Sequence, residues 1–238
     1  IADELSRAAD VLRLHDPGAL VHGYPYVWTF RDAATYYEHC LDPELDTANT
    51  DMVGCDTSGT YHDERYAMPT VNWLAGYYDL MQGIAADRPV CEGEFHYANR
   101  RKIYPGNWSR AMYFQGYIHA LSSSYSWVWH RSESIDAALL MDARILLQSA
   151  EAALDLRRLA EPVTAFHRQP NDVVLLYSNA SGPHSRRDGE RTLSQRIQTD
   201  LVYESLFFEG LKLGFVTERQ VQRGKIGRNV PLIVPNSS

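Results

Sequence analysis

Two carboxylates lie close together in the run Arg88-Pro-Val-Cys-Glu-Gly-Glu-Phe-His96. This run is predicted to form a short buried strand that ends near Glu94, because proline can begin a strand but cannot sit inside one. Side chains alternate along a strand, so Val90, Glu92 and Glu94 are predicted to share one face. A buried carboxylate is costly unless it is paired, hydrogen-bonded or used in chemistry. The two acids are therefore candidates for catalysis, and a strand that simply ends in solvent is the alternative.

The elements that would position these acids alternate regularly over the first 130 residues. Helices are predicted at 2–14, 32–41, 68–85 and 108–121, and strands at 19–23, 51–56, 88–94 and 124–129. Such alternation indicates parallel strands joined by crossover helices. Four such units make half of a (β/α)8 TIM barrel. A small doubly wound sheet is the alternative, although the glycine fingerprint of its nucleotide-binding versions is missing.

The second part of the chain is predicted to open another α/β domain. A long helix is predicted over 135–159, and Glu161-Pro162 is predicted to mark its end. Strands at 172–177, 214–217 and 230–234 and a helix at 192–213 then follow. We therefore predict two domains, a half-barrel over 1–160 and a truncated α/β domain over 161–238.

Composition excludes several kinds of partner. A net charge of −7 argues against nucleic acid or an anionic membrane surface as the main partner. No apolar run approaches the roughly 20 residues that span a bilayer. The three cysteines form no Cys-x-x-Cys pair, so neither a zinc site nor any other metal or cofactor is predicted. Reduced thiols mildly favour a reducing compartment such as the cytoplasm.

Barrel active sites form at the carboxyl ends of the strands, and polar and aromatic residues gather there in this chain. Among these residues are Asp56, Tyr61, Glu92, Glu94, His96, Trp127 and Trp129. Carboxylates cleave glycosidic bonds, and aromatic rings pack against the apolar faces of sugars. The high content of 15 tyrosines and 5 tryptophans fits such a site, although core packing alone would also explain it.

The run from Pro89 to His96 resembles the seventh-strand motif of the clan A glycoside hydrolases. The segments 111–119 and 126–129 look like the helix and the eighth strand that follow it in that clan. The segments 173–178, 203–206 and 232–236 resemble the second domain of glycoside hydrolase family 42 β-galactosidases. That domain is flavodoxin-like or amidotransferase-like in fold and mediates trimerisation. The resemblance thus implies a retaining β-galactosidase-like hydrolase that assembles as a trimer.

The resemblance also implies roles for individual residues. Glu94 matches the nucleophile, and Glu92, at a position that is often polar in the clan, is the second choice and a candidate to bind the substrate. Tyr61 loosely matches a tyrosine that steadies the nucleophile. Trp127 or Trp129 fits the aromatic floor of the sugar subsite. His96 is a candidate substrate-binding residue, with a structural histidine as the alternative.

One part of the family pattern is missing from this chain. The clan's general acid/base is a glutamate that follows an asparagine on the fourth strand, and no Asn-Glu pair occurs here. A retaining enzyme needs two carboxyl groups about 5–5.5 Å apart. We therefore expect a complementary N-terminal half-barrel, as a separate chain or segment, to complete a site for oligosaccharides or β-galactosides. A non-catalytic carbohydrate-binding or oligomerisation module is the alternative.

Overall fold

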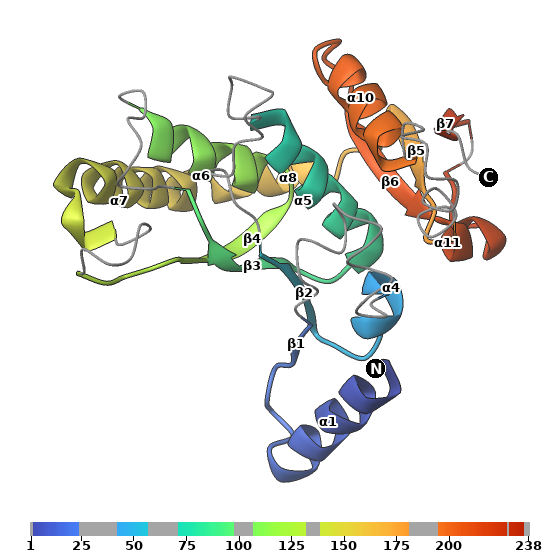
Figure 1. The fold of residues 1–238 in the computed structure, drawn as a ribbon, viewed down its shortest axis with the longest axis horizontal. Helices are drawn as coiled ribbons and strands as arrows, with labels where there is room; N and C mark the ends of the chain where they lie inside the picture. Colours follow the sequence, from blue (N-terminus) through green and yellow to red (C-terminus); the bar gives the residue numbers. More distant parts are fainter. Residues whose placement is uncertain are drawn as a thin grey trace, which may run out of the picture.

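The computed structural model describes residues 2–23, 42–56, 71–97, 107–131, 139–180, 195–227 and 229–235. Its first sheet has four parallel strands in the order β1-β2-β3-β4 (Figure 1). They are β1 (His22–Gly23), β2 (Met52–Cys55), β3 (Val90–Phe95) and β4 (Leu121–Ser126). The predicted parallel neighbours and their order are confirmed.

Helices cover one face of this sheet. The helical elements of this part are α1 (Ala2–His15), α4 (Pro43–Asp46), α5 (Val71–Ala85), α6 (Trp108–Ile118), η1 (Leu139–Met141), α7 (Ala143–Arg158) and α8 (Ala160–His167). Helix α5 packs on β2 and β3, α6 packs on β4, and both α7 and α8 pack on α6. Figure 1 shows α5 to α8 on the same side of β3 and β4. No helix in the described ranges is long and apolar enough to cross a membrane.

The core lies between these helices and the sheet. Its fully buried side chains include Tyr78 and Met81 of α5, Met112 of α6, and Phe95 of β3. The Phe95 ring meets the Tyr113 ring edge to face, with 5.3 Å between their centroids. This aromatic packing holds the carboxyl end of β3 against α6.

A second parallel sheet has the order β6-β5-β7. Its strands are β5 (Val173–Tyr177), β6 (Leu213–Thr217) and β7 (Leu232–Ile233), accompanied by α10 (Gln195–Phe207) and α11 (Glu218–Gln222). Helix α5 of the first sheet also packs against β6 and α10. One helix therefore contacts both sheets and couples them.

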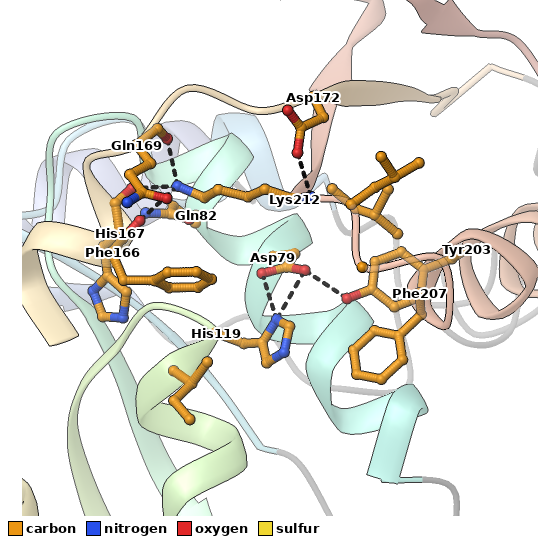
Figure 2. Close-up of a pocket in the computed structure, with 14 residues that line it drawn as sticks. Asp79, Gln82, His119, Phe166, His167, Gln169, Asp172, Tyr203, Phe207 and Lys212 are labelled. Carbon is orange, nitrogen blue, oxygen red and sulfur yellow. Dashed lines mark hydrogen bonds and ion pairs between the residues drawn. The ribbon is translucent and has the colours of Figure 1, made fainter.

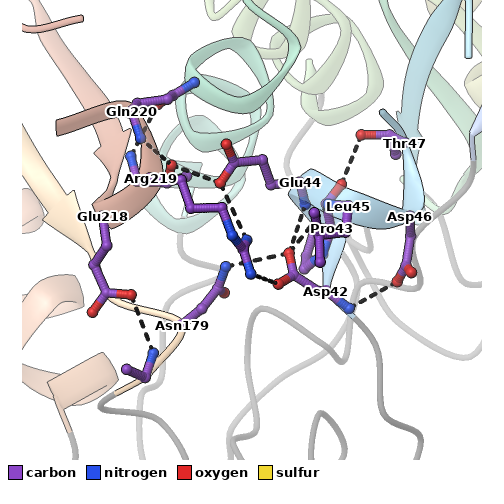
Figure 3. A network of polar contacts seen from close by, with 12 residues as sticks. Asp42, Pro43, Glu44, Leu45, Asp46, Thr47, Asn179, Glu218, Arg219 and Gln220 are labelled. Carbon is purple, nitrogen blue, oxygen red and sulfur yellow. Dashed lines mark hydrogen bonds and ion pairs between the residues drawn. The ribbon is translucent and has the colours of Figure 1, made fainter. Parts of the chain in front are cut away.

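A polar network provides a second link between the two sheets (Figure 3). Arg219 of α11 donates hydrogen bonds to Asp42 Oδ2 at 2.6 Å and to Glu44 Oε2 at 3.4 Å. Asp42 is also the N-cap of α4, where its Oδ1 accepts from the backbone N–H groups of Glu44 and Leu45. The cap thus fixes the carboxylate that receives the guanidinium, so that α4 and α11 hold each other.

Several predicted helix boundaries differ from the structure. The helices expected over 108–121 and 192–213 end earlier, at Ile118 and Phe207. Two further differences have a local cause. The helix expected over 135–159 begins only at Ala143, because Asp142 caps it by accepting from the N–H groups of Arg144 and Ile145. Pro162 was expected to mark a helix end, but it lies in the first turn of α8. Proline is tolerated there because a first-turn N–H has no intrahelical partner. The helix expected at 32–41 lies outside the described residues.

Gly83 allows α5 to approach β6 closely, and replacing it should separate them. A Cβ atom at Gly83 would lie 2.5 Å from the backbone oxygen of Phe215. We expect Gly83→Ala to lower the free energy of unfolding by about 1–3 kcal/mol, although alanine is the better helix former. Urea denaturation measures this. In the control Gly18→Ala, the new methyl would meet only Asp16 Oδ1, at 3.5 Å, so a near-neutral effect is expected. Equal effects of the two changes would contradict the close packing.

Candidate functional site

A cluster of three titratable side chains forms where β2 and β3 end. Asp56 directly follows β2, Glu94 lies near the end of β3, and His96 follows that strand. His96 Nε2 is 3.3 Å from Glu94 Oε2 and 3.7 Å from Asp56 Oδ1. Parallel pairing of Cys55 with Glu92 places both strand ends at the same edge of the sheet. The sequence named Asp56 as a strand-end residue but assigned it no role.

Glu92 and Glu94 occupy different environments. The pairing of β3 with β4 changes register between Glu92 and Phe95, which indicates a β-bulge. Glu92 is fully buried and accepts a 2.9 Å hydrogen bond from the Tyr78 hydroxyl of α5. The Glu94 side chain is 35% exposed and faces His96. The expectation that both acids share one face is therefore wrong, because the bulge breaks the alternation of side chains.

Burial controls the charge of the cluster. Desolvation, and then the negative charge of Glu94, raise the pKa of Asp56 to about 6. Desolvation lowers the pKa of His96, although the hydrogen bond to Glu94 and its charge oppose this. His96 is therefore mainly neutral at neutral pH. The edge thus offers an accessible carboxylate, a neutral imidazole and a buried acid that ionises near pH 6.

Trp127 extends this cluster toward β4. The centroid of its ring lies 5.8 Å from that of His96, and its backbone N–H donates to the Phe95 carbonyl at 3.1 Å. The strand expected over 124–129 would have contained Trp127 and Trp129, but β4 runs from Leu121 to Ser126 and both tryptophans follow it. Trp127 is 40% and Trp129 66% exposed. Tyr61, the predicted neighbour of the nucleophile, lies outside the described residues.

A second polar cluster lines a cavity of about 290 Å³ between the two sheets (Figure 2). Asp79 of α5 accepts hydrogen bonds from His119 Nδ1 and from the Tyr203 hydroxyl of α10. Burial and the nearby Asp79 charge raise the pKa of Tyr203. Lys212 donates to three backbone carbonyls at the end of α8, those of Phe166, His167 and Gln169. These polar groups bind one another, so the cluster joins the two parts of the chain.

Tyr78 supports the buried carboxyl group of Glu92, and its hydroxyl should therefore stabilise the fold. We expect Tyr78→Phe to lower the free energy of unfolding by roughly 1–3 kcal/mol, because a buried carboxyl group loses a hydrogen bond. Chemical denaturation measures the change. The control Tyr125→Phe removes a hydroxyl from an exposed side chain of β4 and should be neutral. A neutral Tyr78→Phe would mean that water or another group replaces the hydroxyl.

No family model and no curated protein matches this sequence. Solved structures do match. An apo exo-carrageenase GH42 from Bacteroides ovatus aligns with a TM-score of 0.75 and 22% identity, over 97% of this chain and 34% of the other. A β-galactosidase from Rahnella sp. R3 aligns with a TM-score of 0.69 and 17% identity, over 89% and 32%. A GH5_18 enzyme from Streptomyces cattleya in complex with GlcNAc aligns with a TM-score of 0.67 and 15% identity, over 99% and 60%.

These likenesses establish the fold. The resemblance to family 42 that the motifs indicated is confirmed for the fold, since an exo-carrageenase GH42 shares the arrangement of nearly the whole chain. The chain spans about a third of the length of that protein. It therefore has the α/β architecture found in part of these glycoside hydrolases.

Proposed function

We propose that this chain forms part of the catalytic unit of a retaining glycoside hydrolase of the β-galactosidase type, with Glu94 as the nucleophile. The observation that carries the proposal is the position of Glu94. It is a partly exposed carboxylate near the carboxyl end of a parallel strand, in a fold similar to those of glycoside hydrolases. Catalytic groups of barrel enzymes occupy such strand ends.

The fold supports a finer assignment within this proposal. Residues 1–160 are the C-terminal half of a (β/α)8 barrel, with β1 to β4 as four sequential barrel strands. Sequential order, parallel pairing and helices on one face support this. Residues 161–238 begin a flavodoxin-like or amidotransferase-like domain, which the parallel second sheet supports. The complementary N-terminal half then pairs with the open edges of the first sheet.

The described residues support distinct roles at this site. Glu94 attacks the anomeric carbon and forms the covalent intermediate. Neutral His96 holds the Glu94 carboxylate by a hydrogen bond, and the partly exposed Trp127 packs on the sugar ring. Glu92 is buried, and its Oε1 accepts from the Glu94 backbone N–H at 3.3 Å, so it positions the nucleophile. Tyr61 and Trp129 complete the proposed substrate-binding set.

The second carboxyl group of the reaction comes from the complementary half-barrel in this proposal. It protonates the leaving group at about 5–5.5 Å from Glu94. The proposed substrates are terminal β-galactosides, including oligosaccharides, and the proposed assembly is a trimer. The fold neighbours named exo-carrageenase and β-galactosidase support a galactose-based substrate.

Mechanism-based labelling tests the proposal. The longest natural polypeptide that carries this chain is incubated with a panel of nitrophenyl glycosides, and then with a 2-fluoro-galactoside. Release of nitrophenol from the β-galactoside, and a mass label on the peptide that contains Glu94, are the expected results. Turnover with a label on another residue would contradict the nucleophile assignment.

The partly exposed Trp127 beside His96 supports a second candidate, a non-catalytic carbohydrate-binding module. In that case Trp127 and Glu94 would bind a sugar without cleaving it. Titration calorimetry that shows oligosaccharide binding, together with no turnover of any glycoside in the panel, would select this candidate.

A further inference from the structure

We propose that Asp56, Glu94 and His96 form a binding site for a first-row divalent cation of the zinc type. The three side chains come from the ends of two adjacent strands, and the proposal rests on their geometry. Cation binding does not depend on the proposed hydrolase activity. Its consequence for catalysis does rest on that activity, because Glu94 is the proposed nucleophile.

The distances suit a shared cation. Ligand atoms bound at about 2.0–2.2 Å in a tetrahedral arrangement are about 3.4 Å apart. His96 Nε2 lies 3.3 Å from Glu94 Oε2 and 3.7 Å from Asp56 Oδ1. The three ligand atoms all lie within 4.8 Å of one another. A cation at this site replaces the hydrogen bond between His96 and Glu94, so the imidazole proton must lie on Nδ1 while Nε2 offers its lone pair.

Asp56 provides an independent reason for a bound cation. Its side chain is 10% exposed, and it makes no hydrogen bond to the residues that the structure describes. The nearby charge of Glu94 has the same sign and acts on Asp56, and no lysine or arginine of the described residues forms an ion pair with either acid. Buried carboxylates of this kind pair with a cation or coordinate a metal. A cation between them would remove their repulsion.

The ligand set selects the kind of cation. Magnesium and calcium prefer sites made only of oxygen atoms. An imidazole nitrogen with two carboxylates suits zinc and its first-row neighbours, and three protein ligands leave a fourth position open. Residues on two hydrogen-bonded strands are held in place before the cation arrives, which lowers the cost of binding.

A cation at this site would compete with catalysis. Coordination engages the Glu94 oxygen that faces His96, so this carboxylate is no longer free to attack a sugar. We therefore expect zinc to inhibit the hydrolase reversibly and competitively with substrate. Chelation should restore the activity.

Cation titration of the complete natural polypeptide, stripped with chelator, tests the site. Zinc is titrated by calorimetry and cobalt by its visible absorption. We expect one site that Asp56→Asn or His96→Gln weakens by at least about tenfold, since each removes one of three ligands. The matched control His130→Gln removes an exposed histidine near the same edge and should leave binding unchanged.

The outcomes separate this inference from the proposed function. Equal cation affinity in the wild type and in both ligand variants, or no binding below millimolar concentrations, would overturn the cation site. Glycoside turnover could persist in that case. Conversely, the ligand variants could weaken cation binding in a protein that turns over no glycoside. That result would support the cation site and contradict the proposed hydrolase function.

Discussion

Glu94→Gln is expected to lower kcat of the complete enzyme by several orders of magnitude, roughly 10⁴-fold or more. Glutamine has nearly the same shape as glutamate but carries no negative charge. It can therefore occupy the same position but cannot attack the sugar. The substitution removes the covalent step of the reaction rather than a single binding contact. Steady-state kinetics with a nitrophenyl β-galactoside measures it, with EDTA present to exclude cation effects.

Chemical rescue distinguishes the nucleophile from a structural acid. Glu94→Gly leaves space for a small anion, so azide should restore part of the activity, whereas Glu94→Gln leaves no such space. Glu92→Gln is the matched control, because Glu92 is buried beneath α5 and positions the strand. Glu92→Gln should lower the stabilisation of the transition state by only about 1–3 kcal/mol, as for the loss of a buried hydrogen bond to a charged group. If Glu92→Gln abolishes labelling by the fluorinated sugar while Glu94→Gln still labels, the assignment is reversed.

Asp56→Asn is expected to stabilise the protein above pH 6. The pKa of Asp56 is about 6 in the fold, against 3.8 for a free side chain, so the folded state holds a proton that the unfolded state loses between these values. Stability therefore falls as the pH rises from about 4 to about 6, and the full penalty persists above that range. This difference in pKa corresponds to roughly 3 kcal/mol. Asparagine resembles the protonated acid and carries no such penalty.

Urea denaturation from pH 4 to pH 8 in EDTA measures this effect. The wild type and Asp56→Asn should be equally stable near pH 4 and diverge up to about pH 6. Asp51→Asn is the control, and its effect on the free energy of unfolding should have the opposite sign. The Val21 backbone N–H, then Arg13, hold the pKa of Asp51 below its usual value, so Asp51 stabilises the fold above that range. A pH-independent difference between the wild type and Asp56→Asn would contradict the raised pKa.

The local pattern of the sequence was sufficient to predict the order of the main elements. Short apolar runs separated by amphipathic helices force parallel strands, since a crossover helix must return the chain to the same end of the sheet. The same logic located Glu94 at the end of β3 and predicted β1 to β4 as neighbours. Pro89 before an apolar run was a local signal that needed no long-range contact.

Features that depend on long-range contacts could not be predicted from this pattern. The bulge in β3 is a property of its pairing with β4, and it places Glu92 in the core while Glu94 remains accessible. The contact of Asp56 with His96 depends on the register between β2 and β3, which sequence periodicity does not specify. Alternation determines which strands form, but pairing register determines which side chains meet. For this reason the sequence predicted the strand that carries Glu94, whereas the residues that surround Glu94 follow from the pairing of the folded strands.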